Sequence, residues 1–282
     1  MAARDLTRGL TFDGAALVYD QFRPRYPREL FDDLAGRAAI NATSRILEVG
    51  CGPGVATEEM ISRGWSVLGV DPGEQLARVA REKFGEERFA VEVSTFEDWR
   101  AHGRRFDVVF SASAFHWVAP EIRWTKAAAV LADGGFIALA GNKALAEGSF
   151  HDFSVATRDE RIVHGVDDER DSPDIADLRY IIRDAAHDIG ALWEAMSPQG
   201  TTVVAGELFD APEVALYPWT RAYSTPEALG LVGTYSRFLV MDDLKRTALF
   251  ERLKEIIDRD YGGELTRHYV SVLATARRDH SG

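Results

Sequence analysis

Short apolar runs alternate with longer segments of mixed character between Ser44 and Asn142. The segments between the runs, such as VATEEMISRG and EQLARVAREKF, place apolar residues at helical spacing. Strands that alternate with helices form right-handed βαβ units around a parallel sheet. The predicted strands of this part of the chain are RILEV, SVLGV, RFAVEV, FDVVFSA and GFIALAG.

Helical segments flank this pattern on both sides. A helical arm is predicted from Ala15 to Leu34, interrupted by the prolines of RPRYP, and residues 150–193 are predicted to be helical. Two later strands, EVALYPWTRAY and HYVSVLATARR, enclose the helical segments PEALGLVGTYS and LKRTALFERLKEIIDRD. We therefore predict an α/β fold with a doubly wound, mostly parallel, seven-stranded, Rossmann-like sheet, in which the last strand is antiparallel to its neighbour.

The same pattern predicts four segments. They are a helical arm (1–40), a cofactor-binding core (41–142), an acidic helical insertion (143–200), and a final part that completes the sheet and the substrate pocket (201–282). Residues 151–190 hold eleven acidic and five basic side chains. This segment is either a solvated helical face or a lid, because long insertions in α/β enzymes often cover the ligand crevice. We expect the arm and the insertion to close over the ligand.

The charge of the chain limits its partners. The formal net charge is −12, which disfavours electrostatic capture of nucleic acid or of an anionic membrane surface. Cys51 is the single cysteine, so the chain forms no internal disulfide, and no apolar run reaches the roughly 20 residues of a membrane span. The opening residues show no secretory pattern, so a cytoplasmic location is expected. The oligomeric state is not indicated.

The candidate ligand site is the run ILEVGCGPG, which places Gly50, Gly52 and Gly54 directly after an apolar strand. A dinucleotide fingerprint needs a third glycine at position 55, where the chain has Val55. Pro53 also removes a backbone donor that a pyrophosphate could use. The turn therefore favours a ligand without phosphates.

An acidic residue ends the next predicted strand. Asp71 follows Gly50 by 21 residues, where a carboxylate can accept hydrogen bonds from two ribose hydroxyls. S-adenosylmethionine has a ribose and carries a zwitterionic methionine portion in place of phosphates. Glu48, beside the turn, offers a negative group toward the cationic end of that ligand.

Several motifs carry a resemblance to a known family. EVGCGPG, VDP, FEDW and FDVVFSASAFHW resemble those of the class I S-adenosylmethionine-dependent methyltransferases. VYDQFRPRYP, AFHW and PWTRAYSTPEALGLVGTYS are similar to the small-molecule branch that includes trans-aconitate methyltransferase. The resemblance implies S-adenosylmethionine as the methyl donor and S-adenosylhomocysteine as the product. It also implies contacts to that cofactor from Tyr19, Arg23, Glu48, Gly50, Cys51, Gly52, Gly54, Asp71, Pro72, Phe96, Glu97 and Ser111.

Some of these residues have simpler interpretations. Arg23 could be a surface charge, and Glu97 could be a helix cap or a solvated carboxylate. His116, at the carboxyl end of a core strand, is the candidate base or substrate-orienting group, with a packed histidine as the alternative. Trp117 either walls the methyl pocket or fills the core. The candidate substrate-binding residues are Tyr26, Trp117, Trp219 and Tyr235.

Methyl transfer is an in-line displacement, so positioning is the main task of the protein. The leading hypothesis is O-methylation of a carboxylate or hydroxyl on a small molecule. Alternatives are C- or N-methylation of a metabolite or natural-product intermediate, a macromolecular acceptor, and a binding module without catalysis. No metal-ligand spacing is present, so a metal-free mechanism is expected.

Overall fold

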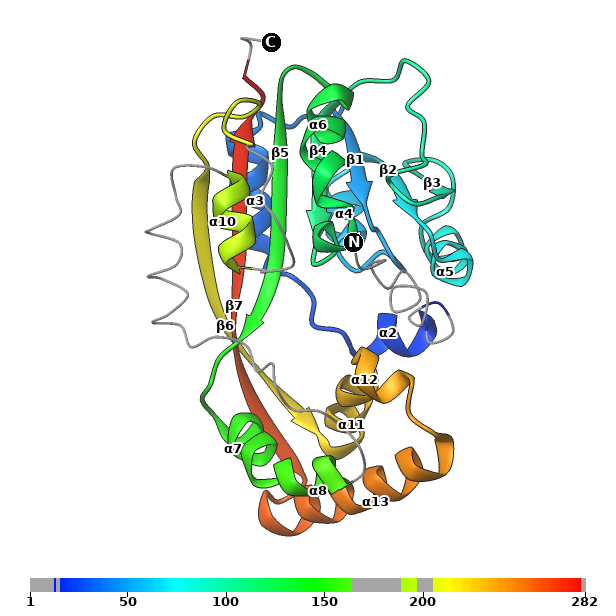
Figure 1. Ribbon diagram of the computed structural model, residues 1–282, viewed down its shortest axis with the longest axis vertical. Coiled ribbons are helices and arrows are strands. Elements are labelled where there is room, and N and C mark those ends of the chain that lie inside the picture. The colour runs from blue at the N-terminus through cyan, green and yellow to red at the C-terminus, as the bar shows by residue number, and fades with distance from the viewer. Residues whose placement is uncertain (1–12, 14–15, 164–188, 197–204, 280–282) are drawn as a thin grey trace. The chain divides into compact units, whose positions relative to one another are not determined.

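The computed structural model describes residue 13 and residues 16–163, 189–196 and 205–279. All seven predicted strands are present, in the spatial order β3-β2-β1-β4-β5-β7-β6 (Figure 1). Their bounds are β1 Arg45–Val49, β2 Ser66–Asp71, β3 Phe89–Val93, β4 Phe106–Ala112, β5 Leu131–Ala144, β6 Glu213–Ser224 and β7 Glu264–Arg277. The first four pairs, β3-β2, β2-β1, β1-β4 and β4-β5, are parallel.

The last strand, β7, runs opposite to its neighbour β5, as predicted. The amide of Arg278 donates to the carbonyl of Gly135, and the amide of Leu145 donates to the carbonyl of His268. Residue numbers therefore rise along β5 while they fall along β7, which makes this pair antiparallel. The mixed, seven-stranded sheet with flanking helices confirms the predicted fold class.

The chain divides into two compact units. The core unit consists of Arg25–Asn142, Ala176–Tyr217 and Ser271–Gly282, and the helical unit consists of Met1–Pro24, Lys143–Ile175 and Pro218–Val270. The four-segment scheme predicted from the sequence stays a prediction. The expected lid falls partly on residues 164–188 and 197–204, which lie outside the described residues.

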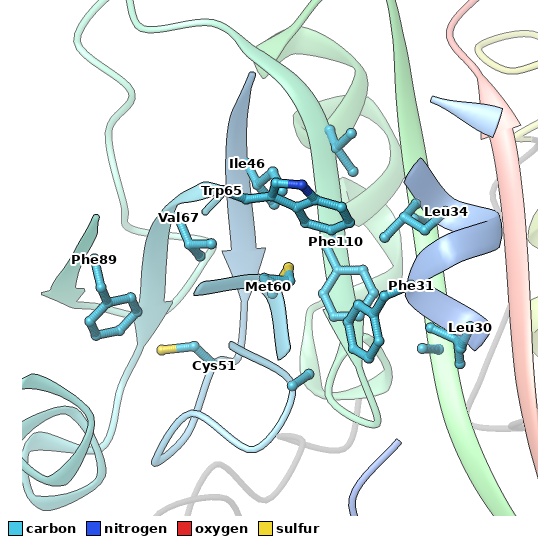
Figure 2. Close-up of a cluster of buried hydrophobic side chains, with 14 of the residues drawn as sticks. Leu30, Phe31, Leu34, Ile46, Cys51, Met60, Trp65, Val67, Phe89 and Phe110 are labelled. Atoms are coloured by element: carbon cyan, nitrogen blue, oxygen red, sulfur yellow. The ribbon is translucent and has the colours of Figure 1, made fainter. Parts of the chain in front are cut away.

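The core unit is held by apolar side chains that cover the parallel strands. Its helices are α3 Arg28–Arg37, α4 Thr57–Ser62, α5 Glu74–Phe84, η2 Phe115–Trp117, α6 Pro120–Val130 and α10 Ile189–Met196. Figure 2 shows Phe31 and Leu34 of α3 beside Phe110 of β4. These side chains are completely buried, and each contributes roughly 2 kcal/mol of hydrophobic stabilisation. The cluster fixes the strands whose carboxyl ends carry the predicted site.

The helical unit has its own core. Its helices are α2 Ala16–Phe22, α7 Ser149–Ala156, α8 Arg158–Val163, α11 Thr225–Gly233, α12 Ser236–Leu239 and α13 Asp243–Asp260. Two caps define its helix starts: Ser224 and Glu227 form a capping box at α11, and the Asp242 carboxylate accepts from the amides of Leu244 and Lys245 at α13. None of the helices in the described ranges is both long enough and apolar enough to span a bilayer. The cytoplasmic location stays a prediction.

Candidate functional site

The glycine turn connects β1 to α4 in a backbone conformation that is unfavourable for residues with a Cβ atom. The φ angles are 71° at Gly50, 53° at Gly52 and 89° at Gly54, all in the left-handed region. The amide of Gly50 donates to the carbonyl of Val70 at 2.8 Å, which anchors the start of the turn to β2. The turn is therefore a fixed feature at the carboxyl ends of two parallel strands.

The three glycines of the turn differ in what lies beside them. A Cβ atom at Gly50 would lie 2.3 Å from the Cβ of Ala114, and one at Gly54 would lie 2.2 Å from the ring of Phe84. A Cβ at Gly52 would meet no atom within 4 Å among the described residues. Gly50 and Gly54 are thus required by packing, whereas Gly52 borders open space that a ligand can occupy.

Asp71 organises this turn. Its Oδ2 accepts from the amide of Gly52 at 2.8 Å, and its Oδ1 accepts from the amide of Gly73 at 2.8 Å. Only 5% of the residue is exposed. A carboxylate has about four lone-pair sites, so both oxygens can accept further hydrogen bonds. Asp71 therefore holds the glycine turn from the end of β2.

Glu48 differs from the sequence expectation of a negative group facing the ligand. It is 1% exposed, and its Oε2 accepts from the hydroxyl of Thr57 at 2.5 Å. Burial, opposed by the Thr57 bond and reinforced by the charge of Asp71, raises the pKa of Glu48 from 4.5 to about 8. At neutral pH Glu48 is mostly protonated, and its contact with Thr57 joins β1 to the start of α4.

The raised pKa makes folding stability depend on pH. Folded Glu48 keeps a proton that the unfolded chain has released, so the free energy of unfolding falls as pH rises between 4.5 and about 8. Glu48→Gln removes this dependence. The unfolding free energy of the variant minus that of wild type is therefore expected to rise by about 4 kcal/mol from pH 4.5 to about 8. Denaturant titrations of both proteins at pH 5, 7 and 8.5 measure this difference.

Glu92→Gln is the matched control, because the Arg104 hydrogen bond lowers the pKa of Glu92. From pH 5 upward that carboxylate is mostly ionised in both states, so the profile of this variant is expected to parallel that of wild type. Parallel profiles for Glu48→Gln and wild type would show that Glu48 is not protonated in the folded protein.

The segment after β4 lies against the turn. The Oγ of Ser113 is 2.9 Å from the hydroxyl of Tyr26, and Ser113 has a φ of 55°. His116 lies in η2, as predicted after the strand, with ring centroids 4.9 Å from Trp117 and 6.5 Å from Trp193. Since the neighbouring Ala114 contacts Gly50, the structure brings Tyr26 and Ser113 close to the glycine turn. Trp117 is 37% exposed, so it does not fill the core.

Other predicted residues of the core unit have structural contacts. The hydroxyl of Ser111 is fully buried and donates to the carbonyl of Val49 at 2.7 Å. The carboxylate of Glu97 accepts from the amide of Ala119, the N-cap residue of α6, which matches the helix-cap alternative. Phe96 is buried beside Trp99, and Pro72 is exposed. Ser111 and Glu97 therefore stabilise the fold, and the predicted cofactor contacts of Pro72, Phe96, Glu97 and Ser111 stay predictions.

The thiol of Cys51 is also buried. Desolvation and the nearby charge of Asp71 raise its pKa well above the usual range, so it is not a reactive thiolate. Within the ranges given above for the described residues, no three His, Cys, Asp or Glu side chains form a cluster that could hold a metal ion. The metal-free mechanism stays a prediction.

Four predicted residues belong to the helical unit. The guanidinium of Arg23 donates to the carbonyl of Thr234 at 3.1 Å and lies over the rings of Tyr19 and Tyr235. Arg23 is therefore more than a surface charge. Trp219 stacks on Tyr269, with ring centroids 4.4 Å apart. The predicted cofactor contacts of Tyr19 and Arg23 and the predicted substrate contacts of Trp219 and Tyr235 stay predictions.

Comparisons with known proteins identify the core. Residues 46–135, which include the glycine turn, Asp71 and β4, match the family model described as a methyltransferase domain. The chain contains a methyltransferase domain at residues 46–135. This confirms the resemblance drawn from EVGCGPG and VDP.

Individual relatives of this methyltransferase agree with the family match. An uncharacterised methyltransferase of Mycobacterium tuberculosis is 28% identical over 256 residues, which cover 90% of this chain and 87% of the relative. A trans-aconitate 2-methyltransferase of Variovorax paradoxus is 31% identical over 124 residues, or 43% of this chain and 46% of that protein. A solved structure from Anaeromyxobacter dehalogenans, described as a candidate type II methyltransferase, has a TM-score of 0.59 and 21% identity over 91% of this chain and 98% of its own. The last match shows the fold alone.

Sequence reasoning missed three residues of the methyltransferase core. Thr57 binds Glu48, Ala114 packs against Gly50, and Ser113 contacts Tyr26. A signal for the last two exists, because SASA (residues 111–114) places small residues at the end of β4 and directly after it. Thr57 gives no such signal, since its role depends on the burial of Glu48.

Proposed function

We propose that this methyltransferase transfers a methyl group from S-adenosylmethionine to a small-molecule acceptor, by O-methylation of a carboxylate or hydroxyl, and releases S-adenosylhomocysteine. The observation that carries the proposal is the pairing of Asp71 with Gly52. The Asp71 carboxylate accepts from the amide of Gly52 at 2.8 Å, and a Cβ at Gly52 would meet no atom within 4 Å among the described residues. A ribose with two adjacent hydroxyls fits this arrangement of acceptor and space.

The residues of the core unit fit this cofactor. Asp71 accepts from the ribose hydroxyls, and the backbone from Gly50 to Gly54 borders the methionine portion. Pro72 and the backbone of Phe96 border the adenine, while Glu97 fixes the start of α6 nearby. Cys51 and Ser111 are buried and act through the shape of the turn and of β4. When bound, S-adenosylmethionine supplies a methyl group activated on a sulfonium.

The chain itself must align the acceptor and handle its proton. Alignment can supply several kcal/mol of the barrier. A carboxylate acceptor needs no base, whereas a hydroxyl acceptor gains roughly 10²-fold to 10⁴-fold from one. His116 is the proposed base or orienting group, because it follows β4 in the segment that contacts the glycine turn. Tyr26 and Trp117 are the proposed acceptor contacts of the core unit.

Two findings support a small acceptor. The trans-aconitate 2-methyltransferase of Variovorax paradoxus is named for a small acid and is 31% identical in the matched region, although that region is less than half of each protein. The net charge of −12 disfavours an RNA acceptor. C- or N-methylation is the second candidate, favoured by the position of His116, since a carbon or amine acceptor must lose a proton.

The decisive experiment is transfer of a labelled methyl group from S-adenosylmethionine, offered in parallel to a small-metabolite extract, total RNA and total protein. Label is expected in the small-molecule fraction. Release of that label by alkali identifies a methyl ester, and its retention identifies another methyl product. Label confined to RNA or protein contradicts the proposal. Binding of S-adenosylhomocysteine without transfer to any fraction would indicate a binding module without catalysis.

A further inference from the structure

Ser113, the first residue after β4, has a backbone conformation that serine rarely adopts. Its φ of 55° lies in the left-handed region, where the Cβ atom comes too close to a backbone carbonyl oxygen. The residue is exposed, so burial of its side chain does not compensate this conformation. A strained residue persists only where its contacts hold it. The contacts of Ser113 therefore decide which course the chain takes after β4.

Two hydrogen bonds hold Ser113. Its amide donates to the carbonyl of Ala140 on β5 at 2.9 Å, and its Oγ lies 2.9 Å from the hydroxyl of Tyr26. The next residue, Ala114, packs so closely against Gly50 that a Cβ atom at position 50 would lie 2.3 Å from its own Cβ. If Ser113 relaxed to a common negative φ, the chain would leave it in another direction. The conformation of Ser113 is therefore coupled to the contact between Ala114 and the first glycine of the turn.

Tyr26 is fixed by contacts other than the one with Ser113. It precedes Pro27, the N-cap residue of α3, and a residue before proline is restricted to extended conformations. The side chain of Tyr26 packs against the buried cluster of which Figure 2 shows a part. The carbonyl of Arg25 accepts from the Nδ2 of Asn142, near the end of β5, at 3.3 Å. The Tyr26 hydroxyl is thus a firm support for Ser113.

The same segment also contacts the other end of the glycine turn. The Nε of Arg25 lies 3.6 Å from the Oε2 of Glu58, whose amide donates to the carbonyl of Gly54 at 3.1 Å. Both charged side chains are close to half exposed, and such ion pairs contribute little stability. The bond between Tyr26 and Ser113 is therefore the stronger of these two links between the segment before α3 and the glycine turn.

We propose that Ser113 is a positioning residue for the cofactor, held by the hydroxyl of Tyr26 in the left-handed conformation that keeps Ala114 packed against Gly50. This role rests on the proposed cofactor and is separate from the proposed acceptor contact of Tyr26. Without the Tyr26 hydroxyl, Ser113 relaxes in a fraction of the molecules, and the glycine turn loses its support there. The apparent affinity for the cofactor falls in proportion to the fraction that stays competent.

The test is calorimetric titration of full-chain variants with S-adenosylhomocysteine. Tyr26→Phe and Ser113→Ala each remove the hydroxyl bond and leave a Cβ atom at a strained position, so the affinity is expected to fall about threefold to tenfold. Ser113→Gly is expected to bind within about twofold of wild type, because glycine adopts this φ without strain. For the same reason, Tyr26→Phe is expected to have no further effect when residue 113 is glycine.

Hydrogen exchange gives a second readout that needs no ligand. The amides of Gly50 and Gly52 are each bonded to a residue of β2. The peptide that covers residues 48–56 is expected to exchange at least about threefold faster in Tyr26→Phe and in Ser113→Ala, since the turn opens more often. In Ser113→Gly its exchange is expected to stay close to that of wild type.

Tyr217→Phe is the matched control. The Tyr217 hydroxyl donates to the Oδ2 of Asp33 at 2.6 Å, and its side chain packs against the same buried cluster as that of Tyr26. This variant is expected to change neither the affinity for S-adenosylhomocysteine nor the exchange of the turn.

Unchanged affinity or unchanged exchange in a folded Tyr26→Phe variant would overturn the proposal. A Ser113→Gly variant that binds as weakly as Ser113→Ala would do the same, because the backbone conformation would then not be what matters. If wild type does not bind S-adenosylhomocysteine, the proposed function fails, and the exchange measurements alone decide the role of Ser113.

Discussion

Asp71→Asn is expected to lower the affinity for S-adenosylhomocysteine about 10²-fold and the rate of methyl transfer at least as much. The carboxylate binds the amides of Gly52 and Gly73 at 2.8 Å each, and both bonds use its negative oxygens. An asparagine must turn its NH₂ group toward one of these two donors. Each hydrogen bond to a charged group contributes about 1.5–3 kcal/mol. The loss of one bond to the turn, together with weaker bonds to the ribose, therefore accounts for the expected loss of affinity of about 10²-fold.

Calorimetric titration with S-adenosylhomocysteine measures this effect, and circular dichroism checks the fold of the variant. Asp107→Asn is the matched control, because the Asp107 carboxylate also accepts from a backbone amide, that of Arg45 at 2.7 Å, but at the amino end of β1. Its affinity for S-adenosylhomocysteine is expected to match wild type. A folded Asp71→Asn variant with unchanged affinity would show that Asp71 does not bind the ribose.

The backbone plan of this site follows directly from sequence order. A glycine turn after one parallel strand and an acidic residue after the next must meet at the carboxyl edge of the sheet. The hydrogen bond from the amide of Gly52 to the carboxylate of Asp71 shows that the two segments meet there. Short apolar runs also located every strand, although β5 begins four residues before the predicted GFIALAG, at Leu131.

Side-chain states could not be predicted in the same way. The proton on Glu48 depends on complete burial and on Thr57, nine residues away, and neither is visible in the pattern of RILEV. In the same short η2 turn, Phe115 is fully buried whereas Trp117 is exposed, because the turn directs its side chains to different sides. Arg161, Arg237 and Arg267 of the helical unit come from α8, α12 and β7, so only the folded chain brings these three arginines to one cavity.

Gly50→Ala is expected to cost about 3 kcal/mol of unfolding free energy, of which roughly 1 kcal/mol comes from the left-handed φ of 71° and the rest from overpacking. Its Cβ would lie 2.3 Å from the Cβ of Ala114, which has no flexible side chain that could move aside. The turn or the segment after β4 must therefore shift. Denaturant unfolding measures the loss.

Gly52→Ala separates stability from ligand binding at the same turn. Its φ of 53° also opposes a side chain, but its Cβ meets nothing within 4 Å, so the expected cost in stability is only about 1 kcal/mol. The new methyl group enters the space assigned to the cofactor, and the affinity for S-adenosylhomocysteine is expected to fall at least about tenfold. Gly36→Ala, inside helix α3 with open space beside it, is the control that leaves binding unchanged and raises stability slightly. If Gly52→Ala binds S-adenosylhomocysteine as tightly as wild type does, the ligand does not approach Gly52. If Gly50→Ala is no less stable than Gly52→Ala, the contact with Ala114 is not the reason why position 50 requires a glycine.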